Sequence, residues 1–498
     1  MIVLFSCSFI SPIKEKKNNK IPNIIIFLVD DMGLMDTSVS FLTDEKNCPK
    51  EFYLNKLYST PNMEKLAKQG VRFSNFYAHS VCSPSRSTIL TGQNSARHGV
   101  TNWIRPEFNN KGDFGPTNWN WEGLTKDKIT LPKILKEAGY KTIHIGKAHF
   151  GPIGSEGSNP MNLGFEVNIA GSSIGQPGSY LGTDNFGNSK GKKKRAVKGL
   201  EIYHGKEVFL TEALTLEAKE VITQSKEEGK PFFLYMSHYA VHSPFQSDIR
   251  FKENYENKNI SEKAKAFATL IEGIDKSLGD IVRHVRNLDL GENTILLFVG
   301  DNGSDAPLKI ENNYSSSFPL KGKKGTHWEG GMRVPFIASW ITPTEKNLLQ
   351  RKLPIKSGYI QEQMGSIMDF LPTLCDITST TIPENYIMDG FNLKKQFLGK
   401  KNRKRKESFL NHYPHKHRSS YFTSLVEMNW KVVYHYQVEN TPKYELYNLK
   451  TDPFESTNLA SNKPIRLKKM MKALQFELQS KNALYPIRNN KVLEVVIP

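Results

Sequence analysis

Nearly continuous apolar runs recur along this chain and indicate buried strands. Asn23–Val29 and Asn293–Val299 are rich in β-branched residues, and Lys141–Ile145 and Phe232–Met236 repeat the pattern in shorter form. Such runs are typical of strands that are covered on both faces of a parallel sheet. Helix-like stretches separate them: Leu131–Ala138, Thr211–Gln224 and Glu262–Val285. The alternation predicts an α/β fold with a large, mostly parallel central sheet that is flanked by helices.

Polar side chains follow each of the four runs. They are Asp30 and Asp31, Lys147 and His149, His238 and His242, and Asp301 and Asn302. Ligands of open α/β sheets bind beyond the carboxyl ends of the strands, so we expect these side chains to meet at one edge of the sheet. The three carboxylates and the amide among them offer only oxygen. That donor set suits a hard cation, Ca²⁺ or Mg²⁺, and argues against zinc.

Cys82 stands at the start of a predicted helix. Pro84 is well placed in its first turn, and Gly92 is a natural stop at its C-terminus. Free backbone N–H groups and the helix dipole favour negative charge at such a position, so the residues alone permit a thiolate nucleophile. A thiolate nevertheless fits poorly beside three metal-binding carboxylates, because sulfur is a poor ligand for a hard cation.

Composition and charge exclude several classes of protein. Of the 498 residues 38% are apolar, and the longest apolar runs are far shorter than the roughly 18 residues that span a bilayer. The four cysteines are too few for a disulfide framework. The net charge of +18 is concentrated in Lys190–Arg195 and Lys400–Lys406, without any nucleic-acid-binding signature, so we predict no nucleic-acid partner. We interpret both runs as solvated loops, with attraction of an acidic polymer as the alternative.

The N-terminal residues suggest export. Met1–Ile10 is a short apolar stub, and a polar tether continues to Lys20. Leu4–Cys7 resembles a bacterial lipoprotein cleavage box, although Phe5 and the lack of a basic start depart from it. We therefore expect a leader over residues 1–20 and a location in the periplasm or at the cell surface, associated with the outer membrane if a lipid anchor is attached at Cys7.

A family resemblance emerges at the cysteine and extends along the chain. Cys82–Arg86 matches the Cys-x-Pro-Ser-Arg signature of the formylglycine-dependent (type I) sulfatases, an arylsulfatase-like family in the alkaline phosphatase superfamily. Further segments resemble that family in its own order, from about residue 22 to 462: Gly146–Gly151, His242–Pro244, Asp301–Gly303, Lys321–Pro335 and Tyr444–Ala460. Ala148, Phe150 and Lys323 depart from its pattern, and alignment on Gly325 favours Lys324 as the active lysine.

The resemblance implies a metal site and an unusual nucleophile. Cysteine 82 is expected to be oxidised by a formylglycine-generating maturation enzyme to 3-oxoalanine (formylglycine), whose hydrate attacks sulfur. The modified Cys82 would bind one Ca²⁺, or Mg²⁺ as the second choice, together with Asp30, Asp31, Asp301 and Asn302. Asp301 would also act as the base.

The remaining roles follow from the same resemblance. Arg86 and Lys147 would hold the nucleophile, and Lys147 and Lys324 would neutralise the sulfate. His242, together with Lys324, would protonate the departing alcohol. His149 would take the proton from the second hydroxyl of the hydrate, which expels sulfate and restores the aldehyde.

The C-terminal part resembles the small sheet of polysaccharide-active sulfatases. Asn411–Arg418 carries three histidines and is followed by two strand-like runs, Tyr421–Glu427 and Lys431–Tyr436. We expect a catalytic domain over 21–399 and a smaller C-terminal subdomain with an antiparallel sheet over 400–498, within an alkaline phosphatase-like fold. His412 and His415 are candidate substrate contacts at the mouth of the pocket, with plain turn residues as the alternative.

The expected function is hydrolysis of sulfate esters on a sulfated polysaccharide or its oligosaccharides by a bacterial enzyme. Ulvan, carrageenan, fucan and glycosaminoglycans are all candidate substrates. Two alternatives remain, namely a phosphonate or phosphate ester hydrolase of the same superfamily and a non-catalytic protein that binds sulfated glycans.

Overall fold

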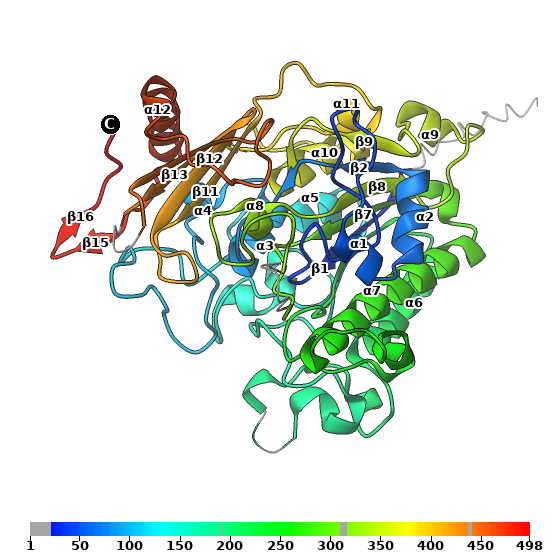
Figure 1. Ribbon diagram of the computed structural model, residues 1–498. Coiled ribbons are helices and arrows are strands. Elements are labelled where there is room, and N and C mark those ends of the chain that lie inside the picture. Colours follow the sequence, from blue (N-terminus) through cyan, green and yellow to red (C-terminus); the bar gives the residue numbers. More distant parts are fainter. Residues whose placement is uncertain (1–20, 190, 192, 309–315, 437–440) are drawn as a thin grey trace, which may run out of the picture.

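The computed structural model describes residues 21–498 except 190, 192, 309–315 and 437–440 (Figure 1). The expected leader with Cys7 and part of the basic run Lys190–Arg195 lie outside the described residues. Among the helices that are described, none has the length and apolar character needed to cross a membrane.

An eight-stranded sheet forms the centre of the large domain, in the order β5-β4-β6-β1-β7-β8-β2-β9. β1 (Asn23–Val29) lies between β6 (Phe232–Ser237) and β7 (Thr294–Gly300), and β4 (Lys141–Gly146) follows β6; all these pairs are parallel. Only β8 (Phe336–Trp340) runs antiparallel to its neighbours in this sheet as described. The mostly parallel sheet that the apolar runs predict is thus confirmed. The strands towards its edges are β2 (Val71–Phe73), β5 (Val167–Ile169) and β9 (Tyr359–Gln361).

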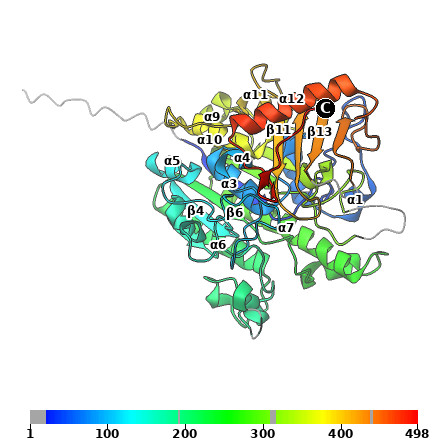
Figure 2. The same ribbon diagram turned by 90° about the vertical axis from the view of Figure 1, so that its left-hand side faces the viewer.

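Helices cover both faces of this sheet because alternate strand residues point to opposite sides. Ile25 and Phe27 of β1 pack with α2 (Pro61–Gln69), α6 (Leu210–Glu227) and α7 (Glu262–Asn287). The intervening Ile24 and Ile26 pack on the other face, whose helices are α3 (Cys82–Thr91), α5 (Leu131–Glu137) and α10 (Phe370–Thr378). Figure 2 shows α6 and α7 on one side of the sheet and α10 on the other. Both faces of the central strands are therefore buried.

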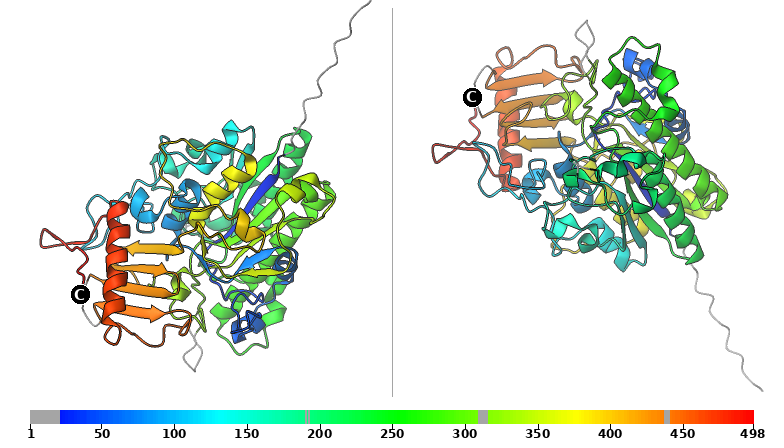
Figure 3. Two further views of the ribbon diagram at one scale, coloured as in Figure 1. Left: turned by 90° about the horizontal axis from the view of Figure 1, so that it is seen from above. Right: turned by 90° about the horizontal axis from the view of Figure 1, so that it is seen from below.

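A separate antiparallel sheet lies near the C-terminus. Its strands are β11 (Ser408–Tyr413), β12 (Phe422–Glu427), β13 (Trp430–His435) and β14 (Tyr444–Asn448), in that order. α12 (Pro464–Ser480) crosses one face of the sheet, as Figure 3 shows. The opposite face contacts the large domain, where Phe409 and Val426 pack with Tyr77 and Met332. The C-terminal antiparallel sheet that the sequence predicts is confirmed.

Short elements complete the chain. They are α1 (Tyr53–Leu57), β3 (Phe76–Tyr77), α4 (Ser95–His98), α8 (Glu329–Met332), α9 (Leu348–Lys352), β10 (Gly365–Ser366), α11 (Lys394–Phe397), β15 (Ile487–Arg488) and β16 (Lys491–Val492).

Candidate active site

The acidic residues that follow β1 and β7 meet at the carboxyl ends of these strands. Because the strands are parallel and in register up to Val29 and Gly300, Asp30 and Asp31 lie beside Asp301 and Asn302. The backbone N–H of Asp31 donates to Oδ1 of Asp301 over 3.0 Å, and Nδ2 of Asn302 donates to Oδ1 of Asp31 over 2.9 Å. All four side chains are buried. Asp31 also has a φ of 58°, which is rare for a residue other than glycine and is common at functional sites.

Helix α3 begins at this acidic cluster. Ligand atoms of Cys82, Asp30 and Asp301 all lie within 4.8 Å of one another. Arg86, one turn into the helix, donates from Nε to Oδ2 of Asp301 over 2.9 Å, and its Nη2 lies 3.4 Å from Oδ1 of Asp30. Gly92 ends the helix in the left-handed region, with a φ of 65°. The helix therefore places its first residue and a buried cation against two carboxylates.

Two lysines from distant parts of the chain complete the cluster. Nζ of Lys147, which follows β4, donates to both carboxylate oxygens of Asp30 over 2.7 and 2.8 Å. Nζ of Lys324 donates to Asp31 over 2.7 Å. Gly146 fits the turn before Lys147 because its φ is 94° and a Cβ there would overlap the Ser237 carbonyl. Each lysine thus neutralises one of the two adjacent aspartates.

Two histidines border the cluster. Nε2 of His149 lies 2.6 Å from the carbonyl oxygen of Ile104, while its buried Nδ1 has no hydrogen-bond partner among the described residues. Nε2 of His242 lies 3.5 Å from Oδ2 of Asp31. Burial, opposed by Asp31 and assisted by Lys324, lowers the pKa of His242 to about 4. Burial likewise holds the pKa of His149 well below its ordinary value, so burial favours the neutral form of both rings.

The electrostatics of the cluster bear on the nature of the nucleophile. Burial raises the pKa of the Cys82 thiol to about 12, although Lys147 and Lys324 act in the opposite direction. Desolvation therefore outweighs the helix N-terminus, and an unmodified Cys82 is a neutral thiol at pH 7. A thiolate nucleophile, which the sequence alone permits, is not favoured here. Burial also raises the pKa of Asp301 to about 6, with Asp30 adding to the shift and Arg86 opposing it.

The donor set fits a hard metal ion. Oδ1 of Asn302 is buried without a hydrogen-bond partner among the described residues, and it lies in a group that otherwise offers carboxylate oxygens. An unpaired buried oxygen is costly unless a cation or a donor satisfies it. Asp30, Asp31, Asp301 and Asn302 together present the oxygen ligands that Ca²⁺ and Mg²⁺ require.

Comparison with known proteins identifies the family. The model of the family described as Sulfatase matches residues 22–380, which is well over half of the chain. The chain belongs to the sulfatase family. A second model, described as N-sulphoglucosamine sulphohydrolase, C-terminal, matches residues 324–483. The residues that the Sulfatase model matches include the whole of the acidic cluster and both lysines.

Individual sulfatases resemble the chain to different extents. Arylsulfatase J of Mus musculus is 28% identical over 381 residues, which cover 75% of this chain but only 55% of that protein. A protein named Sulfatase from Formosa agariphila is 26% identical to this chain. The alignment covers 98% of this chain and 94% of that protein. The crystal structure of Ps i-CgsB has a TM-score of 0.71 at 24% identity and covers 93% of both chains. Ps i-CgsB has also been solved in complex with k-i-k-neocarrahexaose. The structural likeness confirms a sulfatase-like fold, which is consistent with the expected alkaline phosphatase-like architecture.

The two C-terminal histidines that the sequence singles out, His412 and His415, make their hydrogen bonds within the protein. His412 is buried, with Nδ1 2.7 Å from Oγ1 of Thr423 and Nε2 2.8 Å from the carbonyl oxygen of Leu484. His415 is also buried, with Nε2 2.8 Å from Oγ1 of Thr101 and Nδ1 2.9 Å from the carbonyl oxygen of Lys111. Both nitrogens of each ring are thus engaged in hydrogen bonds, and the contact of these histidines with substrate stays a prediction.

Other residues that support the site carry no recognisable sequence signal. Oγ of Ser237 accepts from Nη1 of Arg86 over 2.7 Å, and the carbonyl oxygen of Lys147 accepts from the same nitrogen over 2.8 Å. The hydroxyl of Tyr180 donates to the carbonyl oxygen of His242 over 2.7 Å. These groups fix the orientation of Arg86 and His242 through tertiary contacts alone.

A second buried cluster lies between the segment before α8 and the C-terminal sheet. Ligand atoms of His327, His435 and Glu445 lie within 4.8 Å of one another. Oε1 of Glu445 is 2.8 Å from Nε2 of His435, its Oε2 accepts from Tyr447 over 2.6 Å, and Nδ1 of His327 is 2.8 Å from Oγ of Ser419. These bonds account for most of the polar atoms, so we interpret the cluster as a network that joins the two parts of the protein.

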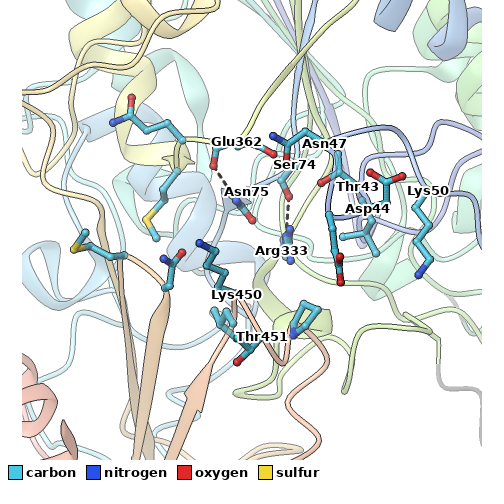
Figure 4. A pocket seen from close by; sticks show the side chains of 18 of the residues that line it. Thr43, Asp44, Asn47, Lys50, Ser74, Asn75, Arg333, Glu362, Lys450 and Thr451 are labelled. Atoms are coloured by element: carbon cyan, nitrogen blue, oxygen red, sulfur yellow. Dashed lines mark hydrogen bonds between the residues drawn. The ribbon is translucent and has the colours of Figure 1, made fainter.

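The large cavity in Figure 4 is distinct from the acidic cluster. It encloses about 1000 Å³ between the 42–52 segment, Ser74–Tyr77, Glu362–Met364 and turns of the C-terminal sheet. Arg333 donates to the carbonyl oxygen of Ser74 at its wall. None of the predicted catalytic residues lines it. The candidate catalytic residues therefore converge at the acidic cluster and not in this cavity.

Proposed function

We propose that this protein is a sulfuric ester hydrolase that removes sulfate from a saccharide, with a formylglycine hydrate at position 82 as its nucleophile and one bound Ca²⁺. The observation that carries the proposal is the convergence of Cys82, Arg86, Lys147 and Lys324 on the acidic cluster in a chain of the sulfatase family. The charges and donors of this cluster fit each requirement of the reaction.

The balance of charge supports binding of both a metal ion and an anionic ester. The cluster contains three carboxylates and three cations, which are Asp30, Asp31, Asp301, Arg86, Lys147 and Lys324. Their charges cancel, so a divalent cation held by the four oxygen ligands gives the site an excess of positive charge. When bound, the metal supplies positive charge beside the nucleophile. With the carboxylates bound to the metal, Lys147 and Lys324, which pair with Asp30 and Asp31, would be available to the sulfate oxygens.

The group at position 82 must attack sulfur and must afterwards release the sulfate that it has taken up. A neutral thiol at position 82 has no second hydroxyl to drive the later release of sulfate, and its sulfur does not match the preference of a hard cation for oxygen. The hydrate of the oxidised side chain supplies two hydroxyls. Asp301 would accept the proton of the attacking hydroxyl, and Arg86 would hold the nucleophile in place.

The two histidines would carry out the remaining proton transfers, one as the alcohol leaves and one as the sulfate is released. His242 would protonate the leaving alcohol with the help of Lys324, and the negative charge of a bound ester raises the pKa of its ring from the value in the free protein. His149, whose Nδ1 is unpaired, would remove the proton of the remaining hydroxyl at position 82. Departure of sulfate then restores the aldehyde.

A sulfated polysaccharide or oligosaccharide is the substrate class that we propose. The complex of Ps i-CgsB with k-i-k-neocarrahexaose supports a saccharide, and the net charge of +18 supports an acidic polymer. We further propose an exported protein, in the periplasm or at the cell surface, that depends on a formylglycine-generating enzyme and can carry a lipid at Cys7. Carrageenan, fucan, ulvan and glycosaminoglycans are the glycans to test.

The experiment that tests the reaction class uses matched aryl esters. Protein that is co-expressed with a formylglycine-generating enzyme is assayed with 4-nitrophenyl sulfate, phosphate and phenylphosphonate at fixed Ca²⁺. Hydrolysis of 4-nitrophenyl sulfate is expected to be faster than hydrolysis of the phosphate or the phosphonate. Faster hydrolysis of the phosphonate or the phosphate would favour the related hydrolases, and no turnover by protein with converted Cys82 would contradict catalysis.

A further inference from the structure

The buried cluster of His327, His435 and Glu445 lies where the large domain meets the C-terminal sheet. Glu445 of β14 is paired with Val433 of β13, so its side chain and that of His435, two residues further on, lie on the same face of the sheet. The neighbouring Val432 packs on the opposite face with residues of α12. His327 precedes α8 and approaches the two strand residues from the large domain. Three segments that are distant in the sequence therefore meet at one point.

One polar atom of this cluster has no partner. Nε2 of His327 is covered, and it makes no hydrogen bond with any residue that the structure describes, although Oε1 of Glu445 is only 3.3 Å away. The side chain of His327 is 6% exposed. Nε2 of His435 lies 2.8 Å from the same carboxylate oxygen. Because a buried nitrogen without a partner is costly, this arrangement indicates a further group between the three side chains.

The spacing of the three side chains fits a metal ion. Ligand atoms that lie about 2.0–2.1 Å from a tetrahedral zinc ion are about 3.3 Å apart. The two nitrogens lie 3.3 and 2.8 Å from Oε1 of Glu445, and one ligand atom of each residue lies within 4.8 Å of the others. Two imidazoles and one carboxylate are a common ligand set for zinc, whereas a hard cation such as Ca²⁺ prefers oxygen alone.

Neighbouring hydroxyl groups hold two of these side chains in orientation. Nδ1 of His327 lies 2.8 Å from Oγ of Ser419, and the hydroxyl of Tyr447 donates to Oε2 of Glu445 over 2.6 Å. Metal-binding histidines and carboxylates commonly use their second polar atom in this way. The two bonds leave Nε2 of the histidine and Oε1 of the carboxylate as the atoms that are directed at the cluster.

The charge states of these groups also suit a cation. Burial, opposed by Glu445, lowers the pKa of His327 to about 4, so the ring is neutral near pH 7, as metal binding requires. Burial raises the pKa of Glu445, but its hydrogen-bonding partners lower it more, and the carboxylate is ionised. The ammonium of the nearby Lys431 already pairs with Glu329 at 3.1 Å and with Glu455 at 2.7 Å. The negative charge of Glu445 is therefore available to a metal ion.

We propose that His327, His435 and Glu445 bind one Zn²⁺ ion, which joins the large domain to the C-terminal sheet. The three protein ligands leave one position of a tetrahedral ion for water. All three residues are buried, so the ion is structural, and such a site is filled as the chain folds around it. It shares no ligand with the acidic cluster and does not depend on the sulfatase function proposed above.

Metal analysis of the full chain tests this assignment. Wild type, His327→Gln and Glu445→Gln are produced in medium with added Zn²⁺, purified in excess Ca²⁺ and analysed by plasma mass spectrometry. We expect about one zinc ion per chain in wild type and about tenfold less in both variants. Two controls should keep the zinc of wild type: His412→Gln removes a buried histidine outside the cluster, and Cys82→Ala removes the thiol of the acidic cluster.

Thermal unfolding provides a second readout. Wild type that is produced with Zn²⁺ should have a higher Tm than wild type from zinc-depleted medium, and this difference should vanish in His327→Gln. If the variants do not fold, wild type that is produced with Co²⁺ in place of Zn²⁺ decides by its visible spectrum, which should be that of a four-coordinate ion. Wild type without bound zinc, zinc that persists in both variants, or the spectrum of a six-coordinate cobalt ion would each overturn the assignment.

Discussion

Replacement of Arg86 by lysine is the sharpest test of how the cluster is held together. The guanidinium makes contacts in three directions: Nε and Nη2 each lie 2.9 Å from Oδ2 of Asp301, and Nη1 donates to Oγ of Ser237 and to the carbonyl oxygen of Lys147. A lysine keeps the charge and can reach Asp301, but its single nitrogen cannot also reach both acceptors of Nη1.

The expected loss follows from those two bonds. Hydrogen bonds from a charged donor contribute about 1.5–3 kcal/mol each, so Arg86→Lys should lower the free energy of unfolding by about 3 kcal/mol or more. Displacement of the nucleophile should also lower kcat on 4-nitrophenyl sulfate about a hundredfold. Urea-induced unfolding, followed by circular dichroism at fixed Ca²⁺, measures the first quantity.

An exposed arginine provides the control. Arg283 pairs with Asp280 on the surface of α7, and Arg283→Lys should change the stability by less than about 0.5 kcal/mol. If Arg86→Lys were as stable as this control and retained its turnover, the contacts of Arg86 would not hold the cluster together.

Three further results are expected. His242→Ala should lose roughly a hundredfold in kcat on sugar sulfates but much less on 4-nitrophenyl sulfate, whose phenolate leaves without protonation; equal losses would assign His242 to binding or structure. Chelation by EGTA should lower both Tm and turnover, and Ca²⁺ should restore them; a protein indifferent to EGTA would contradict the metal site. Burial lowers the pKa of His144 and of His238 to about 3, so the folded state binds fewer protons than the unfolded chain. Urea titrations should therefore show stability falling as the pH drops below about 6.5 towards 3, and a loss confined to alkaline pH would contradict this sign.

The sequence predicts the central sheet well because its signal is local. Asn23–Val29 and Asn293–Val299 are buried on both faces, and this requirement is visible in their composition. The direction of β8 is not visible in this way. Phe336–Trp340 is as buried as the parallel strands β1 and β7, and only the path of the chain makes it antiparallel.

The sequence predicts which residues meet where these residues directly follow parallel strands. It predicts less well the properties that depend on burial, such as the charge of a side chain. Asp30 and Asp301 meet because two parallel strands end together. The charge of Cys82 depends on desolvation, which the helix start alone does not reveal. Whether the ring nitrogens of His412 and His415 are free for a substrate likewise depends on the partners that they find within the folded chain. Spacing in the sequence carries no information on that point.

Mass spectrometry of the Cys82 peptide from active protein tests the central claim most directly. Formylglycine makes the peptide lighter by about 18 Da, and its hydrate leaves the mass unchanged within about a dalton but resists alkylation. Cys48 and Cys375 are free thiols in the same chain and serve as internal controls for alkylation of the denatured protein. We expect both controls to be alkylated while position 82 is not, in proportion to activity. Full turnover by protein in which Cys82 remains entirely an alkylatable thiol would contradict the proposed mechanism.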